Sequence, residues 1–216
     1  MTDSDYGSPY FQSRFSYDRD RDFVWQEVCR YLQPRFVPAD AAILEIGAGY
    51  CHFINHIRGR ERHALDLSAD LAGHASPGVV PHIQSCASLT GFEDSSLDVV
   101  FASNLFEHLT REQLAATFAE IRRVLRTGGR LVIIQPNFRY CAREYFDDYT
   151  HLLVFTHVSL ADRLTAGGFR VEHLSPRFLP FSMKSRLPKS RRLVWLYLRS
   201  PLKPFGAQML VVARKE

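Results

Sequence analysis

Short apolar runs alternate with amphipathic segments along the chain from about residue 20 to the end of the sequence. The apolar runs have the length of buried strands. The segments between them repeat apolar residues every three or four positions, as one face of a helix does. On one helix face of residues 111–125, for example, lie Leu114, Phe118, Ile121 and Leu125. This alternation predicts an α/β fold, in which helices cover a largely parallel sheet.

The expected elements follow one another in a regular order. The strands are expected at residues 41–49 (with a glycine turn at the end), 63–68, 79–84, 97–104, 130–135, 169–174 and 207–214. The helices are expected at residues 21–32 (stopped by Pro34), 51–57, 111–125 (ended by Thr127-Gly128-Gly129) and 159–166. We expect a single domain over residues 1–216, with an N-terminal arm and helix at 1–34, an irregular segment at 136–157 and a basic insertion at 176–205.

The composition narrows the class of protein. Hydrophobic residues make up 46% and charged residues 23% of the chain, as in ordinary globular proteins. The sequence begins MTDSDYGSPY, which is acidic and polar and unlike a secretory signal, and no apolar run is long enough to cross a bilayer. The four cysteines form no Cys-x-x-Cys pair. We therefore expect free thiols, no bound metal and a reducing, cytoplasmic location.

The charge is divided unevenly along the chain. From Arg170 onward there are eleven Lys and Arg against two acids, a balance of +9. The remainder holds 27 − 11 = 16 basic and 23 − 2 = 21 acidic residues, a balance of −5. We expect no nucleic-acid partner, because the body of the protein is acidic and no nucleic-acid-binding motif is present.

A glycine turn follows the first strand. Gly47 and Gly49 allow a tight turn and a close approach of the backbone to a ligand. A dinucleotide site of the Gly-x-Gly-x-x-Gly type would need a third glycine where this chain has His52, which disfavours a nicotinamide cofactor. The alternative is that the glycine turn only connects a strand to a helix and binds no ligand.

Asp66 ends the second strand. In a doubly wound sheet its carboxylate lies beside the first turn, where it can accept hydrogen bonds from ribose hydroxyls. A lone aspartate after a strand is more often a turn residue. In combination with the glycine turn, the ligand-binding interpretation is the better one.

Several motifs in a fixed order extend this pattern. ILEIGAG, HALDLS, LTGFEDSSLDVVFASNLFEHL, VLRTGGRLVI and LTAGGFRV follow one another within about residues 40–175. This order resembles the class I S-adenosylmethionine-dependent methyltransferases, in particular the group with an LEHL-like segment after the fourth strand. The resemblance implies a Rossmann-like, doubly wound, mostly parallel sheet of seven strands with an antiparallel last strand.

The resemblance also implies a cofactor site for S-adenosylmethionine, which leaves as S-adenosylhomocysteine. The residues implied are Glu45, Gly47 and Gly49 along the methionine part, Asp66 at the ribose, Leu67, Cys86 and Ala87 around the adenine, and Asn104 near the sulfonium. The chain departs from the family pattern at Cys51, where a further glycine is usual, and at Cys86, where an aspartate is usual. The second change removes an acceptor for the adenine amino group.

Glu107 and His108 follow the fourth strand. In the family this pair supports the pocket, and we expect the same role here. A histidine in a loop acts as a base only where a neighbour requires it.

The segment at 136–157 lies where this fold binds the methyl acceptor, beyond the carboxyl ends of the strands, and we expect it to form a lid. We expect His151 to be the base for a hydroxyl acceptor, because its ordinary pKa lies near neutrality, with Asp148 as its orienting partner or substitute. The residues expected to contact the acceptor are Asn137, Arg139, Tyr140, Tyr145 and, from the N-terminal arm, Arg14. Solvated loop residues and a frayed terminus are the alternatives.

Residues 184–203 carry an apolar run, Leu193 to Leu198, between basic ends. They are compatible with contact to an anionic membrane or a lipid-linked substrate. Packing on the domain is the favoured interpretation, because the apolar run extends almost all round the helix and suits burial.

The sequence therefore predicts a methyltransferase that acts on a polar small molecule, through a hydroxyl of a saccharide or secondary metabolite. The alternatives are N- or C-methylation, an inactive methyltransferase-like binding subunit and, less favoured, an NAD(P)-dependent oxidoreductase. The oligomeric state is not predicted.

Overall fold

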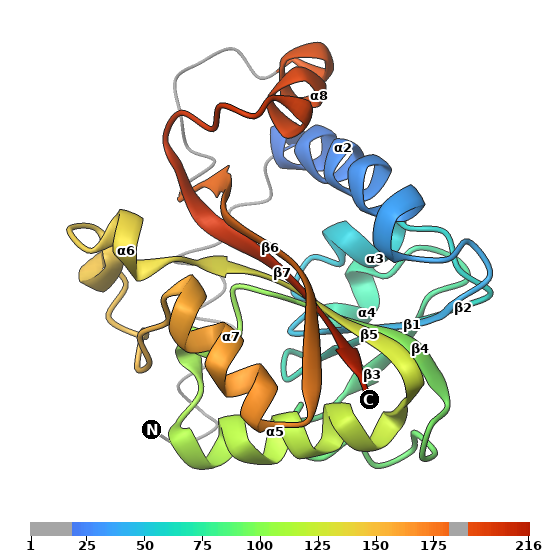
Figure 1. Cartoon of the computed structure of the whole chain (residues 1–216). Coiled ribbons are helices and arrows are strands. Elements are labelled where there is room, and N and C mark those ends of the chain that lie inside the picture. Colours follow the sequence, from blue (N-terminus) through green and yellow to red (C-terminus); the bar gives the residue numbers. More distant parts are fainter. Residues whose placement is uncertain (1–18, 182–189) are drawn as a thin grey trace.

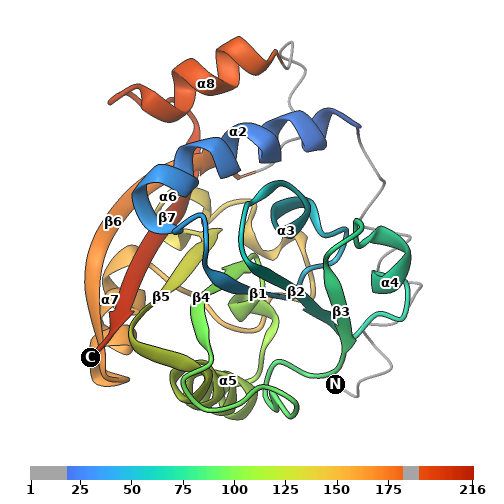
Figure 2. The ribbon, with the colours of Figure 1, turned by 90° about the vertical axis from the view of Figure 1, so that its right-hand side faces the viewer.

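The computed structural model describes residues 19–181 and 190–216, with side chains from residue 21 onward. A single sheet organises these residues (Figures 1 and 2). Its strands are β1 (Ala42–Ile46), β2 (Glu61–Asp66), β3 (Val80–Ile83), β4 (Leu97–Ser103), β5 (Leu125–Pro136), β6 (Phe169–Pro180) and β7 (Gly206–Lys215). They form a seven-stranded sheet in the order β3-β2-β1-β4-β5-β7-β6. The predicted α/β, Rossmann-like fold is confirmed.

The strand directions also agree with the prediction. β1 pairs in parallel with β2 and β4, β3 pairs in parallel with β2, and β5 pairs in parallel with β4. β7 runs antiparallel to both of its neighbours, β5 and β6. The strand order reverses at β1 and β4, so a crevice opens at their carboxyl ends, the usual ligand position in such sheets.

Helices cover both faces of the sheet. The long helices are α2 (Arg19–Phe36), α5 (Arg111–Val124), α7 (His157–Ala166) and α8 (Arg191–Arg199). The short ones are α3 (His52–His56), α4 (Leu71–His74), η2 (Phe106–His108), α6 (Phe138–Cys141) and η3 (Tyr145–Asp147). One core cluster joins α2, α3, α4 and α8 to one face, and a second joins α5 and α7 to the other.

Local sequence explains where the long helices begin. Thr110 and Gln113 form a reciprocal capping box at the start of α5, and Thr156 and Ser159 form one at the start of α7. α7 therefore begins two residues before the expected helix at 159–166. In α5 the predicted face is buried, with Leu114, Phe118 and Ile121 in the second core cluster.

Two predicted boundaries were wrong. α2 continues through Pro34 to Phe36. Proline in the last turn removes only one backbone donor, and the Gln33 side chain donates to the Val37 carbonyl oxygen over 2.8 Å, which holds the end of the helix. Thr127-Gly128-Gly129 was expected to end the helix before it, but lies inside β5. The pairing of β5 with β4 is irregular in this region, and Gly128 has a φ of 81°.

The favoured packing of the apolar run in residues 184–203 on the domain is found, but on one face of the helix only. Residues 176–180 of the expected basic insertion belong to β6 instead. α8 lies beside α2 (Figure 2). In α8 only Leu198 is buried, with Val194 packed beside it against the core that includes α2. Leu193, Trp195 and Leu196 are exposed, because α2 covers one face of α8 only. Contact of this segment with a membrane stays a prediction.

The remaining sequence-wide expectations concern thiols and membrane segments. Cys29, Cys51, Cys86 and Cys141 are all buried and free of disulfides. None of the helices in the described ranges combines the length and the apolarity that a bilayer-spanning segment requires.

Candidate active site

A cavity of about 190 Å³ lies at the carboxyl ends of the central strands. Every residue predicted to bind the cofactor lines it: Glu45, Gly47, Gly49, Asp66, Leu67, Cys86, Ala87 and Asn104. These residues stand at the ends of β1 and β2 or shortly after β1, β2, β3 and β4, so one edge of the sheet gathers them. The assignment of each residue to a part of the cofactor stays a prediction.

The glycine turn after β1 depends on left-handed backbone conformations. Gly47 has a φ of 65°, and a Cβ there would lie 2.9 Å from Cδ1 of Leu105, which packs against the turn. Cys51, where the family usually has glycine, has a φ of 56°. This conformation costs a non-glycine residue about 1–2 kcal/mol. Cys51 is fully buried, so packing around its thiol offsets part of this cost.

Asp66 holds the turn in place. One carboxylate oxygen accepts from the Gly49 amide over 2.9 Å and the other accepts from the Ser68 amide over 3.0 Å. Burial raises the pKa of Asp66, and these backbone amides act in the opposite direction. These two hydrogen bonds fix the carboxylate in the cavity wall, and its contact with a ribose stays a prediction.

Glu45 joins β1 to the helix that follows the turn. Its side chain is buried and accepts from the Ile54 amide of α3 over 2.9 Å. Burial raises the pKa of Glu45 to about 8, the Ile54 hydrogen bond lowers it and the charge of Asp66 raises it further. Glu45 thus lines the cavity and also supports the turn.

The segments after β3 and β4 complete the cavity wall. The Cys86 thiol lies 3.4 Å from the Thr117 hydroxyl of α5, within hydrogen-bonding distance. Asn104 has a φ of 48°, and its side-chain amide donates to the Ser103 hydroxyl over 3.1 Å. The left-handed backbone conformation of Asn104, directly after β4, turns the chain toward η2, which carries the next residues of the site.

Several lining residues were not predicted from the sequence. Arg21 and Trp25 of α2, together with His52, contribute to the wall opposite the strand ends. Burial lowers the pKa of His52 to about 4. The position of α2 over the crevice is a tertiary feature, and no local pattern in residues 21–25 signals it.

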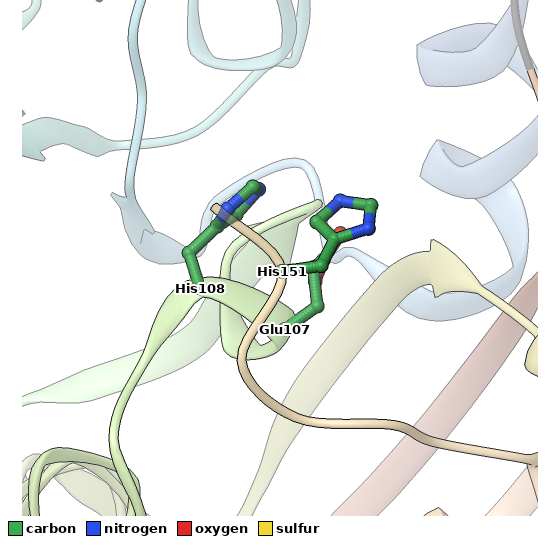
Figure 3. A group of neighbouring side chains, drawn as sticks. All are labelled: Glu107, His108 and His151. Atoms are coloured by element: carbon green, nitrogen blue, oxygen red, sulfur yellow. The ribbon is translucent and has the colours of Figure 1, made fainter. Parts of the chain in front are cut away.

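A second group of polar side chains lies beside the cavity. Glu107, His108 and His151 each offer one ligand-type atom, and these atoms all lie within 4.8 Å of one another (Figure 3). His108 also lines the cavity. The Glu107 carbonyl oxygen accepts from the Leu152 and Leu153 amides over 2.8 and 3.0 Å, so the segment after β5 is tied to the turn after β4.

The hydrogen bonds around this group orient both imidazoles. The Thr150 hydroxyl lies 2.6 Å from an Asp148 oxygen, to which it donates, and 2.9 Å from Nδ1 of His108. The carbonyl oxygen of Tyr145 lies 2.5 Å from Nδ1 of His151. Burial alone would raise the pKa of Asp148, but the hydrogen bonds from Thr150 and the charges of His108 and His151 together lower it. Asp148 thus contacts His108 through Thr150 and interacts with His151 through its charge, and its role as the partner of His151 stays a prediction.

Glu107 is the most isolated acid among the described residues. Glu107 is 1% exposed. Neither of its carboxylate oxygens has a hydrogen-bond partner among the described residues. Burial raises the pKa of Glu107 to about 8. Burial also lowers the pKa of His108 to about 4, assisted by the adjacent His151.

The residues predicted to contact the acceptor are dispersed. Asn137 is fully buried and caps α6, and its side-chain amide donates to the Pro176 carbonyl oxygen over 2.9 Å. Arg139 is exposed, and the Tyr140 ring lies under the Arg177 guanidinium. The Tyr145 hydroxyl donates to the Leu153 carbonyl oxygen. These four residues do not line the cavity at the strand ends. Arg14 lies outside the described residues.

Comparison with known proteins agrees with this geometry. Residues 44–133 match the family described as "Methyltransferase domain", which covers β1 through most of β5. No curated protein matches the sequence.

Solved structures share the fold over almost the whole chain. A chain of the complex between the Haloferax volcanii Trm112 methyltransferase activator and a methyltransferase is 15% identical, with a TM-score of 0.68 and coverage of 91% of this chain and 93% of that one. A SAM-dependent methyltransferase from Archaeoglobus fulgidus is 21% identical, with a TM-score of 0.66 and coverage of 95% and 98%.

A third structure contains the expected product of the cofactor. It is the Burkholderia thailandensis 1,6-didemethyltoxoflavin-N1-methyltransferase with S-adenosylhomocysteine bound, 21% identical, with a TM-score of 0.61 and coverage of 99% and 86%. Members of this family thus use a cofactor of the S-adenosylmethionine type. Residues 44–133 thus match a methyltransferase domain, and the strand order and the glycine turn are those of the class I S-adenosylmethionine-dependent methyltransferase fold.

Proposed function

We propose that the protein transfers the methyl group of S-adenosylmethionine to a hydroxyl of a polar small molecule, such as a saccharide or secondary metabolite. The observation that carries the proposal is the single cavity wall shared by the glycine turn, Asp66 and His108. The first two are the elements with which this fold holds a nucleoside, and His108 belongs to a polar group beside the acceptor side of the crevice.

The chemistry requires little from the protein beyond alignment. The sulfonium methyl is attacked in line by the acceptor oxygen, the C–S electron pair stays on sulfur, and the acceptor proton must leave. Glu107, His108 and His151 supply polar atoms where that proton leaves, and the surrounding cavity wall is mostly apolar. A polar acceptor is favoured because buried polar side chains need polar partners.

The cofactor part is tested by calorimetry with S-adenosylhomocysteine and with NAD. The proposal expects binding of the first and none of the second. Binding of NAD alone would restore the oxidoreductase alternative and overturn the proposal.

The reaction part is tested by a screen of saccharide, phenol, amine and activated-carbon acceptors, with S-adenosylhomocysteine release as the readout. Turnover confined to hydroxyl acceptors is expected, and His151→Ala should reduce it while sparing cofactor affinity. His74→Ala, a half-exposed histidine of α4 that does not line the cavity, is the control. Turnover only with amines or carbon acceptors would contradict the hydroxyl assignment, and binding without any turnover would favour the inactive subunit.

A further inference from the structure

The group formed by Glu107, His108 and His151 has the composition of a metal site. Two imidazoles and one carboxylate converge from η2 and from the segment after β5, with their ligand atoms within 4.8 Å of one another (Figure 3). Bonds of about 2.0–2.2 Å to one cation would bring such atoms to roughly 3–3.5 Å apart, a small closure for three side chains. Sequence spacing did not indicate this site, because 43 residues separate the two histidines.

The carboxylate provides independent support. Glu107 is 1% exposed, and neither of its oxygens has a hydrogen-bond partner within the part of the chain that the structure describes. A buried carboxylate without hydrogen bonds is costly unless a cation compensates it. Side chains that are present only to support a pocket are normally hydrogen-bonded.

The imidazoles have the orientation that metal ligands need. The Tyr145 carbonyl oxygen can only accept, so Nδ1 of His151 carries the proton and Nε2 carries the lone pair. The Thr150 hydroxyl gives its proton to ionised Asp148, so it accepts from Nδ1 of His108, and Nε2 again carries the lone pair. A carboxylate or a backbone carbonyl behind a histidine is the usual outer partner of a metal-bound imidazole.

We propose that Glu107, His108 and His151 bind one divalent transition-metal ion, with Zn²⁺, Mn²⁺, Fe²⁺ and Co²⁺ preferred to Mg²⁺ and Ca²⁺. Imidazole nitrogen selects the first group, and an all-oxygen ligand set would select the second. Three protein ligands leave coordination positions open for a substrate oxygen. His108 lines the cofactor cavity, so those positions adjoin the place proposed for the sulfonium.

This inference rests on the proposed methyl transfer to a hydroxyl and specifies how that hydroxyl is activated. The ion binds the acceptor oxygen and lowers the pKa of its hydroxyl, whose proton passes to water. The resulting oxygen anion forms the new O–CH₃ bond as the S–CH₃ bond breaks, and S-adenosylhomocysteine leaves with the electron pair on sulfur. His151 then serves as a ligand, not as the base.

The test uses the full chain, freed of metal with a chelator and titrated with Co²⁺, whose visible absorption reports its ligands. One Co²⁺ per chain is expected, with loss of the signal in His151→Ala and in the isosteric Glu107→Gln. Thr150→Val removes the outer partner of His108, together with the hydrogen bond to Asp148, and should weaken binding about 10- to 100-fold. Circular dichroism confirms that each variant is folded.

The matched control is His82→Ala. Nε2 of His82 lies 3.0 Å from Nδ1 of His63 on the surface of β2 and β3, a second place where Co²⁺ could bind. This variant should bind Co²⁺ as the wild type does. No stoichiometric binding, or loss of binding in His82→Ala but not in Glu107→Gln, would overturn the site.

Failure of the metal site and failure of the proposed function are separable. S-adenosylhomocysteine binding without Co²⁺ binding removes the metal and leaves the methyltransferase. Co²⁺ binding without S-adenosylhomocysteine binding removes the proposed function. If both bind, chelation should abolish methylation of hydroxyl acceptors without changing cofactor affinity, and full activity after chelation would contradict the activation step.

Discussion

At the residue scale, positive φ angles concentrate at the cofactor turn. Gly47, Gly49 and Cys51 all have left-handed backbones within five residues. The turn brings the Gly49 amide to the Asp66 carboxylate and lines the cavity. This is where a small change in side chain has the largest conformational cost.

Gly47→Ala tests that cost. The new Cβ would meet Leu105 at 2.9 Å, and alanine is disfavoured at a φ of 65°. We expect the free energy of unfolding to fall by about 1–2 kcal/mol, measured by urea denaturation. Gly73→Ala is the matched control, since its Cβ would meet nothing within 4 Å. An equal loss in both variants would contradict the proposed strain.

Asp66→Asn tests the predicted ribose contact. Asparagine keeps one oxygen for the Gly49 or Ser68 amide but loses the charge, and hydrogen bonds to charged groups contribute about 1.5–3 kcal/mol. We expect S-adenosylhomocysteine affinity to fall roughly 10- to 100-fold by calorimetry. Asp70→Asn changes an exposed acid four residues away and should leave affinity unchanged. Unaltered affinity in Asp66→Asn would mean that this carboxylate only supports the turn.

At the element scale, α8 contacts the rest of the molecule along one face. Leu198 is 2% exposed in the core shared with α2, whereas Leu196 on the other face is 56% exposed. Sequence pattern could not separate the two, because which apolar face of a helix is buried depends on the neighbour it meets.

Leu198→Ala and Leu196→Ala form a matched pair. The first leaves a cavity in the core and should lower the free energy of unfolding by about 2–5 kcal/mol, measured by thermal and urea denaturation. The second should change it by less than about 0.5 kcal/mol. Similar losses from both would indicate that α8 is buried on both sides.

The site residues at the strand ends could be predicted because a recognisable residue or turn follows each strand in the sequence. The glycine turn after β1, Asp66 at the end of β2 and Asn104 after β4 carry their own signals, and adjacent parallel strands bring them to one edge. The group around Glu107 was not predictable. It depends on hydrogen bonds from the Leu152 and Leu153 amides to the Glu107 carbonyl oxygen. No periodic pattern in the sequence indicates a contact between these two loops.

At the scale of the whole molecule, a buried acid couples stability to pH. The pKa of Glu45 is raised by burial from 4.5 to about 8 in the folded state. Between those values the folded protein keeps a proton that the unfolded chain has released. The stabilisation that this proton represents is complete below about pH 4.5 and is lost as the pH rises toward 8.

Glu45→Gln should therefore flatten the pH profile. Between pH 5 and 8 the wild type is expected to lose up to about 1.4 kcal/mol per pH unit through this group, and the variant should lack that contribution. Urea denaturation at several pH values measures the difference. Glu93→Gln, at an exposed position, should follow the wild type. Parallel profiles for wild type and Glu45→Gln would show that Glu45 is ionised throughout this range.

The position of β7 has a consequence for the order of folding. β7 lies between β5 and β6, although it follows β6 in the chain (Figure 1). During synthesis β6 and α7 therefore leave the ribosome before the strand that joins them to the sheet exists. The apolar edge of β5 stays uncovered until residues 206–215 have emerged. We expect nascent chains arrested before β7 to engage chaperones and to resist proteolysis only over β1 to β5.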